Sequence, residues 1–389
     1  MVHAHLSRRR LFAGGAGAAV LAASPAGVSG SPVPLTPAPR RIAFGSCAHQ
    51  DKDQPVWDAI VAAQPDLFIF LGDNIYADTR DPDVLRAKYA KLAAKPGFKK
   101  LRDNVPILAI WDDHDFGEND SGCDYPLKDI SKTAFLDFWG EAASSPRRTR
   151  EGIYDSRIYG VSGQRLQIVM PDLRSNRTQL RTLDLGEQGY GAWAKSKQAA
   201  GLPVPGPCER NPDPAATMLG EAQWRWLENE LAQPADVRIL ASSLQVLADF
   251  PGWEAWINYA RDHQRLLDTI RRTQAAGLVC ISGDTHYAEI SKLDLNTPFP
   301  LWDVTSSGLT EVWPVLPPNT NRVGPALREV NFGMIDIDWK GRATTLRLQV
   351  CDVKGAPRLS QTVRLADLQI EPPSVLSANN ARYSSPRLT

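Results

Sequence analysis

Four oxygen-bearing side chains follow one short apolar run of the sequence: Asp73, Asn74, Tyr76 and Asp78. The run, Leu67–Leu71, is rich in branched and aromatic residues and is ended by Gly72, which is typical of a buried strand and its turn. Open α/β sheets place ligand-binding groups at this point, past the carboxyl end of a strand. Carboxylate, amide and phenol oxygens suit a hard metal ion. The same residues also fit a turn that caps the next helix, so this stretch alone leaves two interpretations open.

Further polar clusters come after other predicted strands: Ser46–His49, Asp112–Asp115 with Glu118, Asn119 and Asp120, Ser242–Gln245, and Ser282–His286. Carboxylates as crowded as those of Asp112–Asp115 repel one another unless a cation neutralises them. Any one cluster also fits a solvated acidic loop or a helix cap. Because the clusters recur after successive strands, we expect them to converge on one edge of a parallel sheet, which favours a site for more than one metal ion.

The elements that must position these clusters alternate between strands and helices. The sequence predicts strands at Arg41–Gly45, Leu67–Leu71, Val105–Trp111, Gln167–Met170, Val237–Ala241 and Leu278–Ile281. It predicts helices at Gln54–Ala63, Asp83–Ala94, Ile130–Gly140, Glu221–Leu231 and Ala260–Ala275. This alternation is typical of a layered α/β fold.

The helical pattern stops after Tyr287. Short strands are predicted beyond it at Leu301–Thr305, Gly333–Trp339, Thr344–Val350 and Arg358–Val363, and we expect them to form an antiparallel run packed beside the first sheet. The segment Leu173–Ala216 is long, rich in glycine and proline, and only weakly periodic. Loops of such length in compact domains are usually functional lids or disordered inserts.

The composition is that of a soluble globular protein, with 389 residues, 43% of them hydrophobic, and 44 basic against 44 acidic side chains. This charge balance argues against a nucleic-acid partner, which requires a basic surface.

The cysteines are spread out, at positions Cys47, Cys123, Cys208, Cys280 and Cys351. Their odd number leaves at least one unpaired in an exported protein. Cys123 and Cys208 are candidates for a bridge, whereas Cys280 lies in an apolar strand and is expected in the core.

The first residues have the features of an export signal. Arg8, Arg9 and Arg10 precede an apolar run, Leu11–Ala23, that is too short to span a bilayer. The paired arginines resemble a twin-arginine signal, which implies passage through the twin-arginine export machinery and a periplasmic or extracellular location without a stable membrane anchor. A disordered basic tail is the alternative interpretation. We therefore predict a signal peptide at 1–30, a proline-rich linker at 31–39, one catalytic domain at 40–372 and a flexible tail at 373–389.

Several of these clusters resemble the ordered blocks of one known family. Gly72–Tyr76, Trp111–Asp115 and Gly283–His286 are similar to blocks of the calcineurin-like metallophosphoesterases, and Phe44–Cys47 resembles the alkaline phosphatase D group within them. Pro171–Arg177 and Met218–Trp224 are further matches, so the resemblance covers about Arg40 to Asp303. It implies a four-layer αββα sandwich of two mixed sheets flanked by helices. It also implies a metal-dependent hydrolase of phosphomonoesters or phosphodiesters.

The resemblance implies metal-binding roles for particular residues. Cys47, Asp73 and Tyr76 match positions that hold a ferric ion, and Asp73 also bridges to a second ion, which is calcium in that group. Asp113, Asp284 and His286 match further ligand positions, with His286 on the iron side. Gln245 stands where related enzymes have a histidine ligand.

Other residues match positions that act on the substrate. His114 follows a ligand position, where related enzymes have a histidine that protonates the leaving alkoxide. Asn119 is expected to bind metal or phosphate. Arg174 and Arg177 are suited to hold phosphate with paired hydrogen bonds, although arginines in a surface loop are the alternative. The N-terminal β-rich domain and the C-terminal plugging helix of larger members are not expected in this chain.

The residue types alone also support phosphoester hydrolysis, without the family resemblance. Phosphoester hydrolysis needs charge neutralised on phosphate oxygens, a nucleophile made from water, and help for the leaving oxygen. A thiolate and a phenolate on one ion suit Fe³⁺, and neighbouring carboxylates suit Ca²⁺ or another divalent ion. The substrate is a small or polymeric phosphoester. Two alternatives stay open: a phospholipase D-like or polymer-trimming diesterase of the envelope, and a non-catalytic, metal-stabilised protein that binds ligands through the segment Leu173–Ala216 with Trp253 and Trp256. These two tryptophans also fit a lid or ordinary core.

Overall fold

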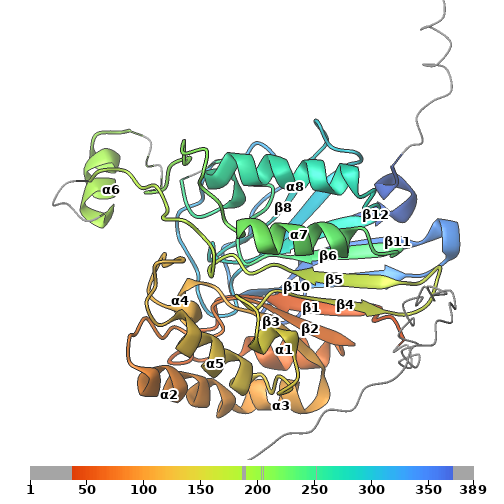
Figure 1. Ribbon diagram of the computed structural model, residues 1–389, viewed down its shortest axis with the longest axis horizontal. Coiled ribbons are helices and arrows are strands. Elements are labelled where there is room, and N and C mark those ends of the chain that lie inside the picture. The colour runs from red at the N-terminus through yellow and green to blue at the C-terminus, as the bar shows by residue number, and fades with distance from the viewer. Residues whose placement is uncertain (1–36, 186–189, 203, 205, 251, 371–389) are drawn as a thin grey trace, which may run out of the picture. The chain divides into compact units, whose positions relative to one another are not determined.

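The computed structural model describes residues 37–185, 190–202, 204, 206–250 and 252–370, and these residues contain two mixed β-sheets. The first sheet has the strand order β12-β11-β10-β1-β2-β3, and the second has the order β4-β5-β6-β7-β9-β8 (Figure 1). The strands of the first sheet are β1 (Arg41–Gly45), β2 (Leu67–Leu71), β3 (Ile107–Ile110), β10 (Asn331–Asp338), β11 (Thr345–Asp352) and β12 (Pro357–Arg364). Those of the second are β4 (Asp155–Tyr159), β5 (Leu166–Met170), β6 (Val237–Ala241), β7 (Leu278–Ser282), β8 (Ala288–Leu293) and β9 (Leu301–Ser306).

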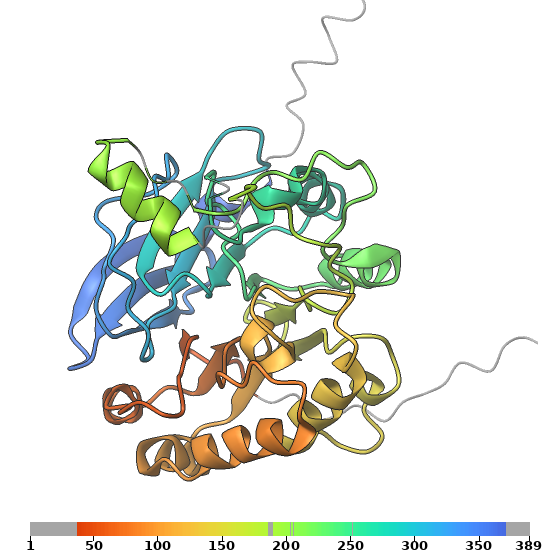
Figure 2. The same cartoon turned by 90° about the vertical axis from the view of Figure 1, so that its left-hand side faces the viewer.

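Helices form the two outer layers. The first sheet is covered by α1 (Val56–Ala62), α2 (Pro82–Ala93), α3 (Pro96–Asn104) and α5 (Lys128–Phe138), and the second by α7 (Gly220–Leu231) and α8 (Ala260–Arg272) (Figure 1, Figure 2). Two short helices, α4 (Asp113–Phe116) and α6 (Tyr190–Ala199), belong to neither layer. This arrangement confirms the predicted αββα sandwich.

The hydrophobic pattern of β2 explains how the first sheet is packed. All five residues of β2 are buried. Phe68 and Phe70 are two positions apart, so they point to the same face of the sheet, where they pack against Trp57 of α1. Phe98 of α3 contacts both Trp57 and Phe70. A strand that is apolar on both faces has to lie between two layers, and β2 therefore lies between the helices and the second sheet.

The C-terminal strands differ from the sequence prediction. β9 runs parallel to β7 inside the second sheet. The antiparallel strands β10, β11 and β12 do not pack beside the first sheet; they continue it, because β10 pairs with β1. The alternating pattern of these strands predicts antiparallel pairing, but it does not reveal which open strand edge they will extend.

Other differences concern elements with weak local signals. The helices α3 and α6 and the strands β4 and β8 were not predicted, and β3 is shorter than expected. Helix α6 lies inside the segment Leu173–Ala216, which was expected to be a loop. The predicted signal peptide, most of the linker and the predicted tail fall outside the described residues. Within the described ranges, no helix is both long and apolar enough to cross a bilayer.

Gly72 joins the ends of two neighbouring strands at close range. Its φ of +97° is in a region that side chains rarely adopt, and a Cβ there would lie 2.5 Å from the Cβ of Asp112. Only glycine therefore lets the chain turn after β2 while β3 ends directly beside it. This close approach brings Asp73 and Asp112 to the same place.

An alanine at position 72 would combine a strained backbone with a steric clash against Asp112. It should therefore destabilise the protein more than an alanine that only strains the backbone. We expect Gly72→Ala to lower the free energy of unfolding by about 3 kcal/mol, from backbone strain plus overpacking, measured by urea denaturation. Gly163→Ala is a matched control, since Gly163 has a φ of +87° but no atom within 4 Å of the new Cβ. It should cost about 1 kcal/mol. Equal losses in the two variants would contradict the steric argument.

Candidate metal centre

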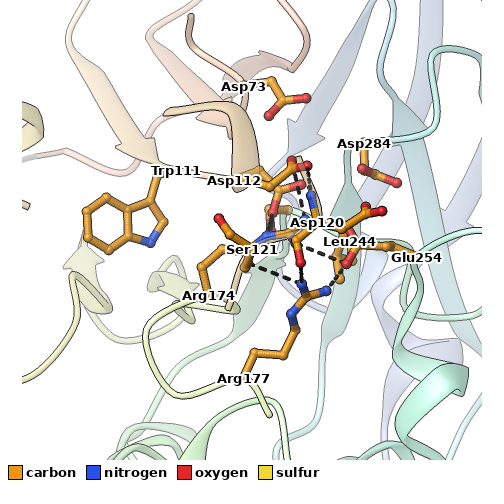
Figure 3. A network of polar contacts seen from close by, with 12 residues as sticks. Asp73, Trp111, Asp112, Asp120, Ser121, Arg174, Arg177, Leu244, Glu254 and Asp284 are labelled. Atoms are coloured by element: carbon orange, nitrogen blue, oxygen red, sulfur yellow. Dashed lines mark hydrogen bonds and ion pairs between the residues drawn. The ribbon is translucent and has the colours of Figure 1, made fainter. Parts of the chain in front are cut away.

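The polar clusters after the strands meet at one place. Their donor atoms form four groups: Cys47, Asp73 and His286; Asp73, Asp113 and His114; Asp112, Asp113 and Asp284; Asp113, Asp120 and Glu254. Within each group the donor atoms lie within 4.8 Å of one another. Asp73 belongs to two groups and Asp113 to three, which is the arrangement that bridging ligands require. Figure 3 shows several of these carboxylates together.

The first group has the donors of a mixed sulfur, nitrogen and oxygen site. The Sγ of Cys47 lies 3.4 Å from Oδ2 of Asp73, and the phenol oxygen of Tyr76 lies 3.3 Å from the same carboxylate atom. The Tyr76 oxygen is also 2.9 Å from Nε2 of His286. The structure thus brings together the residues that the sequence proposed for one ion, from the ends of β1, β2 and β7.

The loops that carry these residues hold an unusual backbone conformation. Cys47, Asp73, Asp284 and His286 have φ values of +64°, +48°, +73° and +58°. Such conformations cost about 1–3 kcal/mol each and persist where the surroundings enforce them. Here the His286 amide donates to Oγ of Ser307, and the Ala48 amide donates to the carbonyl of Asp73. Strain concentrated at these positions supports a functional role.

The loop after β3 is fixed by the cap of helix α4. The amide of Asp112 donates to Oδ1 of Asp115, which closes the first turn of α4 and fixes Asp113 and His114 on it. Asn74 donates through Nδ2 to the carbonyl of Ile110 and to Asp115. Asn74 therefore ties the β2 loop to the β3 loop, and its amide nitrogen serves structure.

The electrostatics of the cluster indicate a missing positive charge. Burial, together with nearby carboxylates, raises the pKa of the Asp73 and Asp284 carboxyls well above the ordinary value. Burial likewise raises the pKa of the Cys47 thiol and of the Tyr76 phenol. Oδ1 of Asp73 is buried and has no hydrogen-bond partner among the described residues. A bound cation would reverse these shifts and satisfy that oxygen, so the donor set fits metal ions.

Arg174 and Arg177 lie beneath this cluster, where they bind carboxylates. Arg174 is fully buried, and its guanidinium pairs with Asp112, with Asp113 at 3.5 Å and with both oxygens of Glu254. Arg177 is also fully buried and contacts Glu254 and the carbonyl of Asp120 (Figure 3). Neither is a loop arginine at the surface, and neither lines the cavity. This corrects the expectation that they hold phosphate: Arg174 positions the carboxylates.

Gln245, which stands where related enzymes have a histidine ligand, is held in a hydrogen-bond network. Its Nε2 donates to Glu289 and Thr305 at 2.9 and 3.0 Å, and its Oε1 accepts from the Tyr287 hydroxyl at 3.1 Å. The side chain is buried, and these three hydrogen bonds engage both its amide nitrogen and its amide oxygen. Its place after β6 fixes the position of the residue, but not the direction of its side chain.

His114 and Asn119 face the space above the cluster. Nδ1 of His114 lies 2.7 Å from Oδ1 of Asp78. Burial alone would lower the pKa of His114, but Asp113, Asp73 and Asp78 outweigh it and raise the pKa to about 11 in the absence of a metal ion. Asn119 is exposed and lines the same cavity. Both residues are therefore open to a ligand.

A cavity of about 770 Å³ opens over the cluster. The segment Leu173–Ala216, which was expected to be a loop, contributes Leu183, Pro207 and Cys208 to its wall. The Leu183 amide donates to the carbonyl of Pro207, and the Cys208 amide donates to the carbonyl of Gly252.

The candidate bridge between Cys123 and Cys208 is absent, and all five cysteines, which lie in described ranges, are free. Glu254, which no sequence motif marked, lines the cavity beside Trp253. Trp256 is core and donates to Ser242.

Removing the Arg174 charge tests its role as a positioning residue. Arg174→Met leaves buried carboxylates without a counter-charge, so we expect the free energy of unfolding to fall by about 3–5 kcal/mol in urea denaturation. Arg271→Met, which removes an exposed partner of Asp268, should cost under about 1 kcal/mol. A raised KM with unchanged stability would instead show direct contact of Arg174 with phosphate.

Comparisons with known proteins agree with this geometry. The profile of the PhoD-like phosphatase family matches residues 42–321, while a search of curated proteins finds no match. Among solved structures, the chain is similar to PhoD, with 16% identity and a TM-score of 0.62 over 85% of this chain and 69% of that chain. It is also similar to GAP50, the anchor in the inner membrane complex of Plasmodium, with 12% identity and a TM-score of 0.50 over 87% and 90% of the two chains. The structural likenesses show the fold. The family match spans most of the chain, so this protein belongs to the PhoD-like phosphatases and is a metal-dependent phosphoester hydrolase.

Proposed function

We propose that this protein hydrolyses phosphomonoesters, phosphodiesters or both at a two-metal site that holds Fe³⁺ and Ca²⁺. One observation carries the proposal: the Asp73 carboxylate belongs to two neighbouring donor groups and has a buried oxygen that no described residue hydrogen-bonds. The group with the Cys47 thiol lies beside the Tyr76 phenol, and these anionic donors suit a ferric ion. The donors around Asp113 and Asp284 are carboxylates, which suit calcium or another divalent ion.

The two ions, when bound, would neutralise phosphate oxygens and supply a nucleophile from water. The water oxygen bonds to phosphorus, the bond to the alcohol oxygen breaks, and the departing oxygen must take up a proton. His114 lines the cavity with Nδ1 engaged by Asp78, which leaves Nε2 to give that proton. Asn119 lines the same cavity, which supports a role in binding metal or phosphate.

The cavity volume favours a second candidate within the same chemistry. A space of about 770 Å³ is larger than a small monoester needs, which supports a phospholipase D-like or polymer-trimming diesterase of the envelope. Comparing kcat/KM for a monoester and for the methyl diester of the same alcohol separates the two candidates, because only a diesterase will prefer the diester.

Asp73→Asn tests the shared ligand. The change keeps the shape of the side chain but removes its charge, so we expect hydrolysis of a chromogenic phosphoester to fall by at least ~100-fold while circular dichroism remains that of the wild type. Asp58→Asn, at an exposed carboxylate of α1, should retain full activity. Wild-type activity in Asp73→Asn would contradict the proposal.

Metal analysis of the same proteins tests the identity of the ions. Wild-type protein should contain iron, and both Cys47→Ser and Tyr76→Phe should lower its iron content. Iron near zero in the wild type would remove the ferric assignment while leaving a two-metal hydrolase. Background turnover with both metals present would favour a binding protein without catalysis.

We also propose export through the twin-arginine machinery to the periplasm or the medium. The support is the sequence around Arg8 and Arg9 and the apolar run after it. Changing both arginines to lysine should retain the precursor in the cytoplasm of a bacterial host, measured by cell fractionation and immunoblotting. Unchanged export of that variant would contradict the assignment.

A further inference from the structure

One side of the cavity is aromatic and has no part in the hydrolysis as proposed. We define the aromatic wall as Tyr190, Trp253 and Trp313, which all line the cavity. Ring centroids are 5.2 Å apart between Tyr190 and Trp253 and 5.6 Å apart between Trp253 and Trp313. Trp313 in turn lies 6.5 Å from the ring of His286. The wall is thus a continuous row of rings that begins at a proposed metal ligand and leads away from it.

The aromatic wall is held by the backbone around it. The amide of Trp313 donates to the carbonyl of His286, so the first ring is fixed to the metal-binding loop. Beside Trp253, the Cys208 amide donates to the carbonyl of Gly252 at 3.0 Å. A Cβ at Gly206 would lie 1.6 Å from that same carbonyl oxygen, so the two segments cross as closely as glycine allows. The wall is therefore a built surface.

The described residues that line the cavity include several carboxylates, and its only basic side chains among them are the imidazoles of His114 and His286 at the metal centre. None of the described residues that line it is a lysine or an arginine. The nearby Arg174 and Arg177 are buried and paired with carboxylates. Asp120 lines the cavity in addition to the proposed ligands. A substrate group placed here meets negative charge and aromatic faces, which repel an anion and accept an apolar ring or a cation.

Building on the proposed hydrolase function, we infer that the aromatic wall binds the alcohol portion of the substrate. It selects phosphoesters whose alcohol carries an aromatic or other apolar group and no second negative charge. The phosphate itself lies at the metal centre, where His286 begins the row of rings. Substrates with several phosphates, or with a carboxylate on the alcohol, are disfavoured because the described residues that line the cavity provide no lysine or arginine to receive them.

Phosphoesters with leaving alcohols of similar acidity test this inference without changing the chemical step. Ethyl and 2-(2-naphthyl)ethyl esters compare size, and 2-(4-carboxyphenyl)ethyl and 2-(4-trimethylammoniophenyl)ethyl esters compare charge, each as monoester and methyl diester. We expect the naphthyl ester to exceed the ethyl ester by at least ~10-fold in kcat/KM, and the cationic ester to exceed the anionic one by a similar factor. Equal values throughout would overturn the inference and leave the hydrolase function intact.

Variants locate the effect on the wall. Trp253→Ala should reduce the preference for naphthyl over ethyl to ~3-fold or less, mainly through KM, while the rate on the ethyl ester stays near that of the wild type. Trp302→Ala is the matched control, because Trp302 is a half-buried tryptophan of β9 that packs against Lys292 and does not line the cavity. A loss of the same factor for every ester in Trp253→Ala would contradict the assignment.

Binding of the free alcohol keeps the two proposals distinguishable. Calorimetric titration of metal-loaded protein with 2-(2-naphthyl)ethanol needs no turnover, and the affinity should fall at least ~3-fold in Trp253→Ala but not in Trp302→Ala. If no ester is hydrolysed yet this difference is found, the catalytic proposal fails and the wall keeps its assigned role. Equal affinity in the wild type and in both variants would overturn the inference.

Discussion

The need to neutralise crowded, buried carboxylates governs this structure. Asp73, Asp112 and Asp113 are at most 3% exposed and lie beside the half-buried Asp284, and repulsion between carboxylates is strong where so little water screens them. Arg174 offsets part of this charge from below through Asp112 and Asp113. Burial, together with neighbouring carboxylates, raises the pKa of Asp73, of Asp284 and of the Cys47 thiol well above their ordinary values. Bound cations are what would allow these side chains to be anionic at neutral pH.

This constraint also explains why the site lies at the seam between the two sheets. The loops after β1, β2 and β3 supply Cys47, Asp73 and Asp113, whereas the loop after β7 supplies Asp284 and His286. Hydrogen bonds join the sheets at the same place: Ser243 donates to Asp112 at 2.8 Å, and the Trp111 indole donates to Asp172 at 2.9 Å. The group of Cys47, Asp73 and His286 and the group of Asp112, Asp113 and Asp284 each take donors from both sheets. The packing of the two sheets and the assembly of the site are therefore one event.

Sequence reasoning reached most of the donor set because each donor follows a strand with a clear apolar pattern. Topology predicted that the clusters containing Cys47, Asp73, Asp113 and Asp284 would converge, since parallel strands bring their carboxyl ends together. The family resemblance singled out these residues within the clusters. The side-chain direction of Gln245, the burial of Arg174 and the place of Glu254 were not accessible in this way. These depend on contacts between segments distant in sequence, such as the pairing of Arg174 with Glu254. The same reason explains why the sheet that β10 joins was not predicted.

The placement of the charged side chains in the site affects which substrates it can bind. Arginines that would ordinarily receive a phosphate are instead buried as counter-ions, and the described residues lining the cavity provide no lysine or arginine in their place. Under the proposed function, the negative charge of a phosphoester is met at the metal centre beside His114, and the aromatic wall lies along another side of the cavity. Affinity for the phosphate and preference for the alcohol are thus assigned to separate parts of one cavity. Changes in the aromatic wall can alter which alcohol is accepted without altering the chemistry of the phosphoryl group.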